Sequence, residues 1–395
     1  MILLTSEKKT VLVRVDLNST YDRKILDNER FAGAETTIKE LIRKNAKVVL
    51  LAHQGRAGEK DFLPLNQHAK ILSRYIGKKV IFVPDVIGAK AKKAIKNLRP
   101  GDVLLLNNVR FVKDEEDEKK ALASKSSIVK ALAPLADIFV NDAFSVSHRA
   151  QASVVGFARL PCCFGRLMQE EIESVKKVFG LPGPHVFILG GAKSDDCIGI
   201  LEHILKTNPQ SIAHALTCGV TANIFMKAKG MKIGKKSEEL IKKKKLEDQI
   251  GYARNILKKY SSKIILPEDV AIESKKKRIE VPIKKIPADA QILDIGNVTI
   301  KKYKKIITAA KTIVVKGPAG LYEDKRFSKG TKELFDCVAK SRAFSIIGGG
   351  DTTQALNKLK ISRKKFSHVS LGGGALITYL SGKSMPGIDV ILKKR

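Results

Sequence analysis

The feature of the sequence that most restricts its fold is a regular alternation of short apolar runs and longer segments of helical periodicity. The apolar runs of the first half are TVLVRVDL (10–17), AKVVLLAH (46–53), KVIFVPDV (79–86), DVLLLNNV (102–109) and DIFVNDAF (137–144). Between them stand segments such as AETTIKELIRKNA (34–46) and ALASKSSIVKALAPLA (121–136), where apolar residues recur every three or four positions. This β–α–β–α order predicts parallel sheets covered by helices.

The second half of the chain repeats the pattern with HVFILGGAK (185–193), SIAHALTCG (211–219), KIILPEDV (263–270), TIVVKGPAG (312–320), FSIIGGGD (344–351) and HVSLGGG (368–374). Because 395 residues exceed the roughly 250–300 that one core usually holds, we expect two domains. LPCCFG (160–165) breaks the rhythm, and RLMQEEIESVKKVF (166–179) then begins a long helix. The expected fold class is α/β, with two doubly wound parallel-sheet domains joined by a hinge, over 1–160 and 165–379.

The charge balance is strongly basic, with a net charge of +34. Such an excess fits attraction of anionic substrates, a lysine-coated surface or polyanion binding. The densest lysine stretch, 232–245, has helical spacing and is interpreted as a solvated helix face, with a polyanion-binding patch as the alternative. Because no ribbon of alternating basic and aromatic residues stands out, we expect no dedicated nucleic acid partner.

Cysteine usage and hydropathy favour a cytoplasmic protein without a membrane partner. The five cysteines are odd in number and include the adjacent Cys162 and Cys163, which makes a poor disulfide framework. No CxxC or HxxxH spacing predicts a structural zinc site. The apolar start of MILLTSEKK is too short for a secretory signal, and no apolar run approaches the roughly 18 residues of a membrane helix.

Polar residues follow the apolar runs of the first half, where open parallel sheets bind their ligands. They include Asp16, Asn18, His53–Arg56, Arg110 and Arg149, with Arg30 in a loop. The guanidinium group suits bidentate recognition of carboxylate or phosphate. A single arginine after a strand is most often a surface ion pair, but several at equivalent positions predict an anion-binding face.

Glycines occupy the equivalent positions of the second half, in GGAK (190–193), KGPAG (316–320), GGGDT (348–352) and GGGA (372–375). Such turns let backbone N–H groups approach a phosphate at the start of a helix. One turn alone is weak, but four in one domain predict a phosphate-binding site, with Asp351 and Glu323 beside it. The GxGxxG fingerprint and a P-loop are both missing from the sequence. Together the halves predict phosphoryl transfer, which depends on positioning and charge stabilisation.

At these positions the sequence resembles the phosphoglycerate kinase family. The blocks VLVRVDLN, LAHQGR, LLLNNVRF, VNDAFSVSHRAQASVVG, ILGGAK, KGPAGLYE, IIGGGDTT, HVSLGGGA and MPGIDV stand in the order of that family's motifs over residues 10–390, and short insertions resemble archaeal members. The resemblance implies reversible phosphoryl transfer between 1,3-bisphosphoglycerate and ADP, giving 3-phosphoglycerate and ATP, with Mg²⁺ as cofactor. It also implies that residues 380–395 return to the first domain.

The resemblance implies a phosphoglycerate site in the first half, made of Asp16, Asn18, Arg30, His53, Gln54, Gly55, Arg56, Arg110 and Arg149. Asp16 and Asn18 would bind the hydroxyl and carboxyl region of the substrate. The three arginines after strands would clamp its distal phosphate, and Arg30 would neutralise charge on the migrating phosphoryl group. His53 would reinforce the site, although without the resemblance it would be interpreted as a satisfied structural histidine.

The resemblance also implies a nucleotide site made of Lys193, Cys197, Lys316, Glu323, Gly349, Gly350, Asp351 and Thr352. Glu323 resembles a ribose-hydroxyl ligand and Asp351 resembles the magnesium ligand. The turn containing Gly373 would offer backbone N–H groups to the phosphoryl group in transit. The expected catalytic residues are Arg30, Lys193, Gly350 and Gly373.

Three positions depart from the family's usual pattern. Cys197 stands where bacterial and eukaryotic relatives usually have a second lysine, and Lys316 stands where the family typically has asparagine. TCGVTAN (217–223) keeps one glycine of the family's triplet. We hypothesise that Lys316 supplies the cation missing at Cys197; the alternative is that Lys316 reflects only the lysine-rich composition. A reactive-thiol role for Cys197 is disfavoured because this transfer needs no thiol.

These observations favour an active kinase acting on the small molecules 3-phosphoglycerate, 1,3-bisphosphoglycerate, ATP and ADP. One alternative is a nucleotide-binding regulatory protein with impaired kinase activity, which the changes at Cys197 and Lys316 would suit. Another is a polyanion-binding protein, which the net charge of +34 would suit. We expect a monomer, with a dimer as the alternative.

Overall fold

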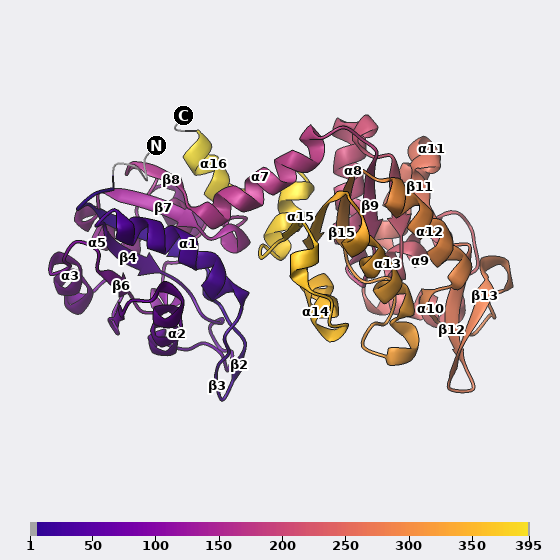
Figure 1. Cartoon of the computed structure of the whole chain (residues 1–395), viewed down its shortest axis with the longest axis horizontal. Helices are drawn as coiled ribbons and strands as arrows, with labels where there is room; N and C mark the ends of the chain where they lie inside the picture. The colour runs from indigo at the N-terminus through magenta and orange to yellow at the C-terminus, as the bar shows by residue number, and fades with distance from the viewer. Residues whose placement is uncertain (1–5, 394–395) are drawn as a thin grey trace. The chain divides into compact units, whose positions relative to one another are not determined.

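The computed structural model describes residues 6–393, which form two compact units (Figure 1). The first unit comprises residues up to Ile172 and those from Ser384 on, and the second comprises Glu173–Lys383. The start of MILLTSEKK and the last two residues of the segment 380–395 lie outside the described part. The division falls inside helix α7 (Arg166–Gly180), whereas the sequence puts the limits at 160 and 165, which stay a prediction.

The first unit is built on a six-stranded sheet, all parallel, in the order β5-β6-β4-β1-β7-β8. Its strands are β1 (Thr10–Val15), β4 (Lys47–Leu51), β5 (Val80–Phe82), β6 (Val103–Leu105), β7 (Ile138–Asp142) and β8 (Cys162–Phe164). Val11, Val13 and Val15 of β1 lie in the apolar core with side chains of the helices on one face. Successive side chains point to opposite faces, so Arg14 lies on the other face of the sheet.

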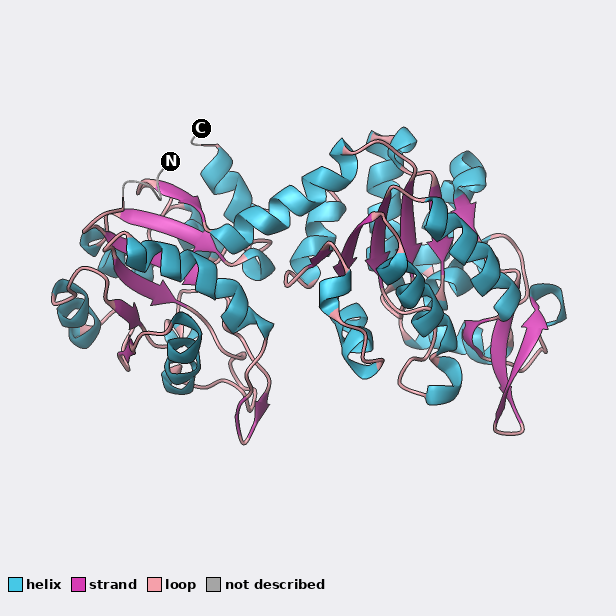
Figure 2. Cartoon of the chain, in the orientation of Figure 1, coloured by secondary structure: helices cyan, strands magenta, loops and turns pink. Residues whose placement is uncertain are grey.

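Helices flank the sheet (Figure 2). They are α1 (Glu29–Arg43), α2 (Asn66–Ile76), α3 (Ala89–Lys96), α4 (Glu118–Leu122), α5 (Ser127–Leu132) and α6 (Ala152–Val155), and a small hairpin pairs β2 (Tyr21–Asp22) with β3 (Lys24–Ile25). The start of α1 is capped by Asn28, whose Oδ1 accepts a hydrogen bond from the Arg30 backbone N–H at 2.9 Å. Glu29 in the first turn and Arg43 in the last complement the helix dipole.

One expectation about the first unit is wrong. The sequence treats LPCCFG as a break in the β–α rhythm, whereas Cys162–Phe164 form β8 and pair in parallel with β7. The strand has only three residues, and its two cysteines are buried as small apolar side chains. A run this short carries little periodicity, which is why the pattern did not reveal a sixth strand.

The C-terminal helix α16 (Pro386–Leu392) packs within the first unit. Its Gly387 backbone N–H donates to the Ser147 carbonyl at 2.9 Å, and Asn141 Nδ2 donates to the Gly387 carbonyl at 3.0 Å. A Cβ at position 387 would lie 2.7 Å from a methyl carbon of Val154. Glycine at this position therefore allows the end of the chain to lie against the loop after β7.

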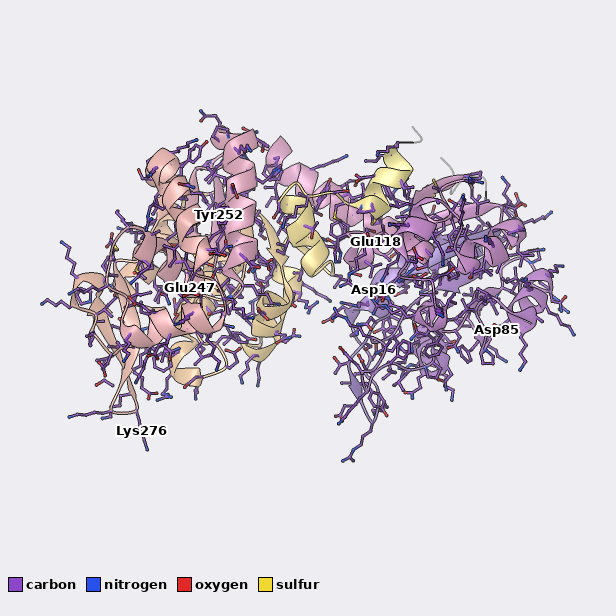
Figure 3. All side chains as sticks on the ribbon, turned by 180° about the vertical axis from the view of Figure 1, so that it is seen from behind. Asp16, Asp85, Glu118, Glu247, Tyr252 and Lys276 are labelled. Atoms are coloured by element: carbon purple, nitrogen blue, oxygen red, sulfur yellow. The ribbon has the colours of Figure 1, made fainter. Side chains whose placement is uncertain are left out.

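The second unit repeats the architecture with a parallel sheet in the order β11-β10-β9-β15-β16-β17. Its strands are β9 (His185–Leu189), β10 (His214–Thr217), β11 (Ile264–Ile265), β15 (Thr312–Lys316), β16 (Phe344–Gly348) and β17 (His368–Val369). A separate antiparallel sheet joins β12 (Asp269–Ser274), β13 (Lys277–Pro282) and β14 (Ile292–Ile295). Lys276 marks the tip of the β12–β13 hairpin (Figure 3).

The helices of the second unit are α8 (Ser194–Thr207), α9 (Gly219–Ala228), α10 (Lys235–Lys243), α11 (Asp248–Tyr260), α12 (Asn297–Ala309), α13 (Lys329–Lys340), α14 (Gly350–Lys358) and α15 (Gly374–Leu380). Helix α10 contains most of the lysine-rich stretch, with Ile241 buried and its lysines exposed, as predicted for a solvated helix face. Within residues 6–393, no helix has the length and apolar character needed to cross a membrane.

Candidate active site

The first unit brings most of its predicted site residues to the carboxyl ends of β1, β4, β6 and β7, and Arg30, which the sequence put in a loop, lies instead in the first turn of α1. Hydrogen bonds tie the loop after β1 to the loop after β4. The Gly55 backbone N–H donates to Asn18 Oδ1 at 2.9 Å, and the Ser19 backbone N–H donates to Gln54 Oε1 at 2.8 Å. Gly55 has a φ of 64°, and a Cβ there would lie 2.4 Å from the Asp61 carbonyl oxygen, so only glycine fits this turn.

Asp16, labelled in Figure 3, is a buried carboxylate whose two oxygens are both engaged. Its Oδ2 pairs with Arg30 Nη1 at 2.7 Å and accepts from the Ser145 hydroxyl, while Oδ1 accepts from the Asn18 backbone N–H at 2.9 Å. Burial acts to raise the pKa of Asp16, but the charge of Arg30 and these hydrogen bonds outweigh it and hold the pKa at about 2. Asp16 is therefore ionised and orients the guanidinium of Arg30.

Three guanidinium groups influence one another at this end of the sheet. Arg110 lies in the short 3-10 turn Val109–Phe111 after β6, and its Nη1 donates to the Gly55 carbonyl at 2.5 Å. Burial lowers the pKa of Arg110, and the positive charges of Arg149 and Arg56 lower it further. Glu116 Oε1 at 3.4 Å from Arg110 Nε offsets only part of this repulsion. The cluster is suited to a multiply charged anion, which would neutralise charge that the protein leaves in excess.

His53 follows β4 and is buried, with 5% of its surface exposed. Its Nδ1 lies 3.1 Å from Nη2 of Arg14, a fully buried residue of β1. Arg14 also reaches Ser153 of α6, whose hydroxyl in turn contacts Glu115. Arg14, Ser153 and Glu115, which lie behind the site, were not predicted from the sequence. The one available signal was a lone arginine at an inward position of the apolar run TVLVRVDL.

The second unit has a pocket at the carboxyl ends of its strands. Its lining residues are Gly191, Ala192, Gly219, Val220, Leu240, Lys244, Gln291–Asp294, Pro318, Gly320–Glu323 and Asp351. The pocket therefore brings together two predicted site residues, Glu323 and Asp351, which come from different loops. A lining of apolar side chains and glycine backbone with a few polar groups is typical of a small-molecule ligand site.

Close backbone contact explains the glycines after β9 and β15. The Gly190 N–H donates to the Lys316 carbonyl, and the Gly191 N–H donates to the Pro318 carbonyl, both at 2.8 Å. A Cβ at Gly317 would lie 2.2 Å from the Gly190 carbonyl oxygen. These glycines are required for the two turns to pack together, whatever they do with a ligand.

The glycine turns after β16 and β17 begin helices. Gly349, with a φ of 96°, precedes α14, whose first turn contains Gly350, Asp351 and Thr352. The buried Thr352 hydroxyl accepts from the Gly317 N–H and donates to the Gly348 carbonyl, each at 2.7 Å, so it ties this turn to the one after β15. Gly373 precedes α15 with a φ of 54°.

Cys197 and Lys316, two of the three departures noted in the sequence, lie together. Lys316 is the last residue of β15, and its Nζ lies 2.9 Å from the Lys193 carbonyl oxygen and 3.2 Å from Asp196 Oδ2. Burial raises the pKa of the Cys197 thiol, although the Lys316 ammonium acts to lower it. The Cys197 thiol is thus protonated at neutral pH and donates to the Gly190 carbonyl at 3.4 Å. Lys193 itself is exposed at the start of α8.

No group of three or more His, Cys, Asp or Glu side chains in residues 6–393 could hold a metal ion without further ligands. A magnesium ion that arrives with a nucleotide needs only one or two protein carboxylates, because phosphate oxygens and water complete its shell. Asp351 in the first turn of α14 fits that requirement, and Glu323 lines the same pocket.

An arginine cluster on one α/β unit and a glycine-lined pocket with carboxylates on the other define a two-unit phosphotransferase. A family model described as phosphoglycerate kinase matches residues 3–383. The chain is 46% identical to the phosphoglycerate kinase of Methanosarcina mazei, over 97% of this chain and 92% of that protein. It is 43% identical to that of Methanothermus fervidus, over 98% of this chain and 94% of that protein.

Solved structures agree with these sequence comparisons. The crystal structure of phosphoglycerate kinase from Pyrococcus horikoshii superimposes with a TM-score of 0.88 at 36% identity, covering 98% of this chain and 96% of that one. The enzyme from Coxiella burnetii gives a TM-score of 0.84 at 34% identity, covering 100% and 98%. The chain belongs to the phosphoglycerate kinase family, whose members are phosphotransferases with a carboxyl group as acceptor.

The repulsion within the arginine cluster generates a prediction about Arg56, the exposed member. Arg56→Ala removes a positive charge that repels Arg110 when no substrate is bound. It also removes a guanidinium group that would bind the anionic substrate. We expect the free energy of unfolding to stay within about 0.5 kcal/mol of wild type. The dissociation constant for 3-phosphoglycerate should rise about tenfold, equal to about 1.4 kcal/mol. Urea titration and calorimetric binding measure the two quantities.

Arg99→Ala, another exposed arginine of the same unit, is the matched control and should change neither quantity. Equal affinity of Arg56→Ala and wild type for 3-phosphoglycerate would contradict the anion-binding role of the cluster.

Proposed function

We propose that this chain catalyses the reversible, magnesium-dependent transfer of a phosphoryl group between 1,3-bisphosphoglycerate and ADP. The observation that carries the proposal is the cluster of Arg110 with the charges of Arg56 and Arg149, beside the ionised Asp16–Arg30 pair. The three clustered arginines suit a phosphate monoester, and Arg30 suits a carboxylate or acyl phosphate. A phosphorylated sugar acid has both groups.

The first unit holds the phosphoglycerate in this proposal. Arg56, Arg110 and Arg149 bind the distal phosphate, and the two joined loops, with Asn18 after β1 and Gln54 and Gly55 after β4, fix the other end. Asp16 is ionised and paired with Arg30, so it orients that guanidinium and accepts a hydrogen bond from the substrate's hydroxyl group, and it does not bind the substrate's carboxylate directly. The Arg30 guanidinium, with 31% of its side chain exposed, then neutralises charge on the phosphoryl group in transit.

The second unit holds the nucleotide. Glu323 accepts hydrogen bonds from ribose hydroxyls, and backbone N–H groups of Gly349, Gly350 and Gly373 bind phosphate oxygens at the starts of their helices. Asp351, with Thr352 fixing its helix, supplies a carboxylate for magnesium, which when bound neutralises phosphate charge. Lys193, exposed at the start of α8, adds a cation near the phosphoryl group.

The chemistry is a direct displacement at phosphorus. A β-phosphate oxygen of ADP attacks the acyl phosphorus of 1,3-bisphosphoglycerate, and the bond between that phosphorus and the C1 oxygen breaks. The products are ATP and the free carboxylate of 3-phosphoglycerate, so no proton is transferred and no base is needed. The residues contribute positioning and positive charge, consistent with a Cys197 thiol that is buried and protonated.

We further propose that the molecule acts as a cytoplasmic monomer on these small molecules. All five cysteines are free thiols, which suits a reducing compartment.

The first test of the function is turnover of 3-phosphoglycerate and ATP with magnesium, coupled to NADH oxidation. Arg30→Ala should lower kcat by about 100- to 1,000-fold, because it removes a cation that acts on the transition state. Arg43→Ala, at the other end of α1, should retain wild-type kcat. No turnover by folded wild-type protein would refute the proposal and favour a nucleotide-binding regulatory protein with impaired activity.

We also propose that Lys316 supplies the cation missing at Cys197. Burial acts to lower the pKa of Lys316, but nearby groups, including the Asp196 carboxylate, raise it overall, so the ammonium stays charged. Its bond to the Lys193 carbonyl also fixes the turn that carries Lys193. One buried ammonium can thus add positive potential and hold the exposed lysine in position.

Lys316→Asn should therefore raise KM for ATP about tenfold, with KM for 3-phosphoglycerate unchanged. Lys311→Asn, which removes an exposed lysine just before the same strand, is the matched control. If both variants keep the wild-type KM for ATP, Lys316 is simply one lysine of a lysine-rich chain.

A further inference from the structure

Arg14 is the largest fully buried side chain of the protein among the residues described. It lies on the central strand β1, opposite Leu51 of β4 and Asn141 of β7. A guanidinium can only donate hydrogen bonds, and leaving it unpaired inside a sheet would be costly. Its contacts therefore identify the neighbouring groups that must accept a hydrogen bond. An atom that accepts one carries no proton of its own toward Arg14, which determines the tautomer of a neighbouring histidine.

The guanidinium donates in three directions. Nε donates to the Ser153 hydroxyl at 2.8 Å, Nη1 donates to the Val15 carbonyl at 2.5 Å, and Nη2 contacts His53 Nδ1 at 3.1 Å. The Ser153 hydroxyl uses its own proton to donate to Glu115 Oε1 at 2.5 Å, and Glu115 Oε2 accepts from the Ser153 backbone N–H at 3.0 Å. Glu115 and Ser153 thus hold Arg14 in one orientation.

The pKa values of Arg14 and Glu115, the two buried ionisable groups of this network, are both shifted from their usual values. Burial lowers the pKa of Arg14 to about 10, so its guanidinium remains protonated at neutral pH. Burial raises the pKa of Glu115 to about 7, against the charge of Arg14, which acts to lower it. Arg14 therefore keeps its positive charge at neutral pH, and its Nη2 contacts Nδ1 of His53.

The contact with Arg14 assigns the tautomer of His53. Because Arg14 Nη2 can only donate, His53 Nδ1 must be the acceptor and carries no proton. Burial, followed by the charge of Arg14, holds the pKa of His53 well below its usual range, so the ring is neutral. A neutral imidazole without a proton on Nδ1 has its proton on Nε2. His53 is then a neutral ring that accepts a hydrogen bond from Arg14 through Nδ1 and has a hydrogen-bond donor at Nε2.

We propose that Arg14 is a positioning residue of the phosphoglycerate site, which fixes His53 as a neutral Nε2–H donor toward the bound sugar acid. This rests on the proposed function, in which the first unit binds phosphoglycerate. A donor that is neutral adds a directed hydrogen bond to a carboxylate or hydroxyl oxygen without adding charge beside Arg30. His53 in this role selects for an oxygen acceptor on the substrate.

His68 provides an internal comparison in the same unit. Its Nε2 lies 3.0 Å from Gln54 Oε1, which also accepts from the Ser19 backbone N–H, so His68 donates through Nε2 as well. Its tautomer is fixed by Gln54 and owes nothing to Arg14. Removing Arg14 should therefore change the state of His53 and leave that of His68 unaltered.

Nitrogen-15 NMR of histidine-labelled full-length protein at neutral pH tests the assignment directly. In wild type, the His53 signals, identified by their loss in His53→Gln, should show an unprotonated Nδ1 and a protonated Nε2. In Arg14→Met, the His53 signals should shift toward a mixture of tautomers while those of His68 stay in place. A protonated His53 Nδ1 in wild type overturns the proposal, whether or not any variant folds.

Steady-state kinetics test the positioning role. Arg14→Met should raise KM for 3-phosphoglycerate about tenfold or more, because His53 would lose the fixed tautomer that lets it donate a hydrogen bond to the substrate. KM for ATP should stay unchanged. Arg14→Lys, which keeps the charge but has one donor group, should recover part of the loss. Equal rises in both KM values, or a changed tautomer with an unchanged KM for 3-phosphoglycerate, would overturn the role. Failure of the kinase function itself would appear as no turnover in wild type with the His53 tautomer as assigned.

Discussion

Charge buried at the carboxyl end of β1 is the constraint on which the first unit depends. A parallel sheet covered on both faces leaves its strands to apolar residues, yet Arg14 and Asp16 stand at its centre. Each is tolerated because a partner is held against it: Arg30 lies 2.7 Å from Asp16, and Ser153 lies 2.8 Å from Arg14. An unpaired buried charge would cost several kcal/mol. The helices that carry these partners, α1 and α6, are therefore fixed by a requirement of folding, so Arg30 is oriented by the protein itself.

The second unit meets a different constraint, the contact of two backbone turns. The turns after β9 and β15 are joined by hydrogen bonds of 2.8 Å, and a side chain at Gly190 or Gly317 would collide with the opposite turn. This packing places the Lys316 side chain next to the start of α8, where its ammonium donates a hydrogen bond to the Lys193 carbonyl. A residue that looks like one of many lysines in the sequence is thus buried at the point where a nucleotide phosphate is expected.

The sequence alone predicted the two parallel sheets, because runs that are apolar on both faces are long enough to stand out between helical segments. It also predicted which residues follow the strands, since the carboxyl ends of parallel strands share one edge. It missed β8 because a three-residue run with two cysteines has no periodicity. It missed Glu115 and Ser153 because they follow no strand directly and gain their importance only by contact with Arg14. The proximity of Cys197 and Lys316 was expected only from the family resemblance, because a long stretch of chain separates them and no local pattern links them.

A phosphoglycerate kinase forms and consumes an acyl phosphate of phosphoglycerate. Hydroxylamine converts such an acyl phosphate into a stable hydroxamate, so trapping with hydroxylamine detects the proposed reaction itself. With 3-phosphoglycerate, ATP and magnesium, we expect hydroxamate and ADP in equal amounts, and no hydroxamate when 3-phosphoglycerate is left out. Formation of ADP without hydroxamate, or of neither by folded protein, would contradict the proposed function.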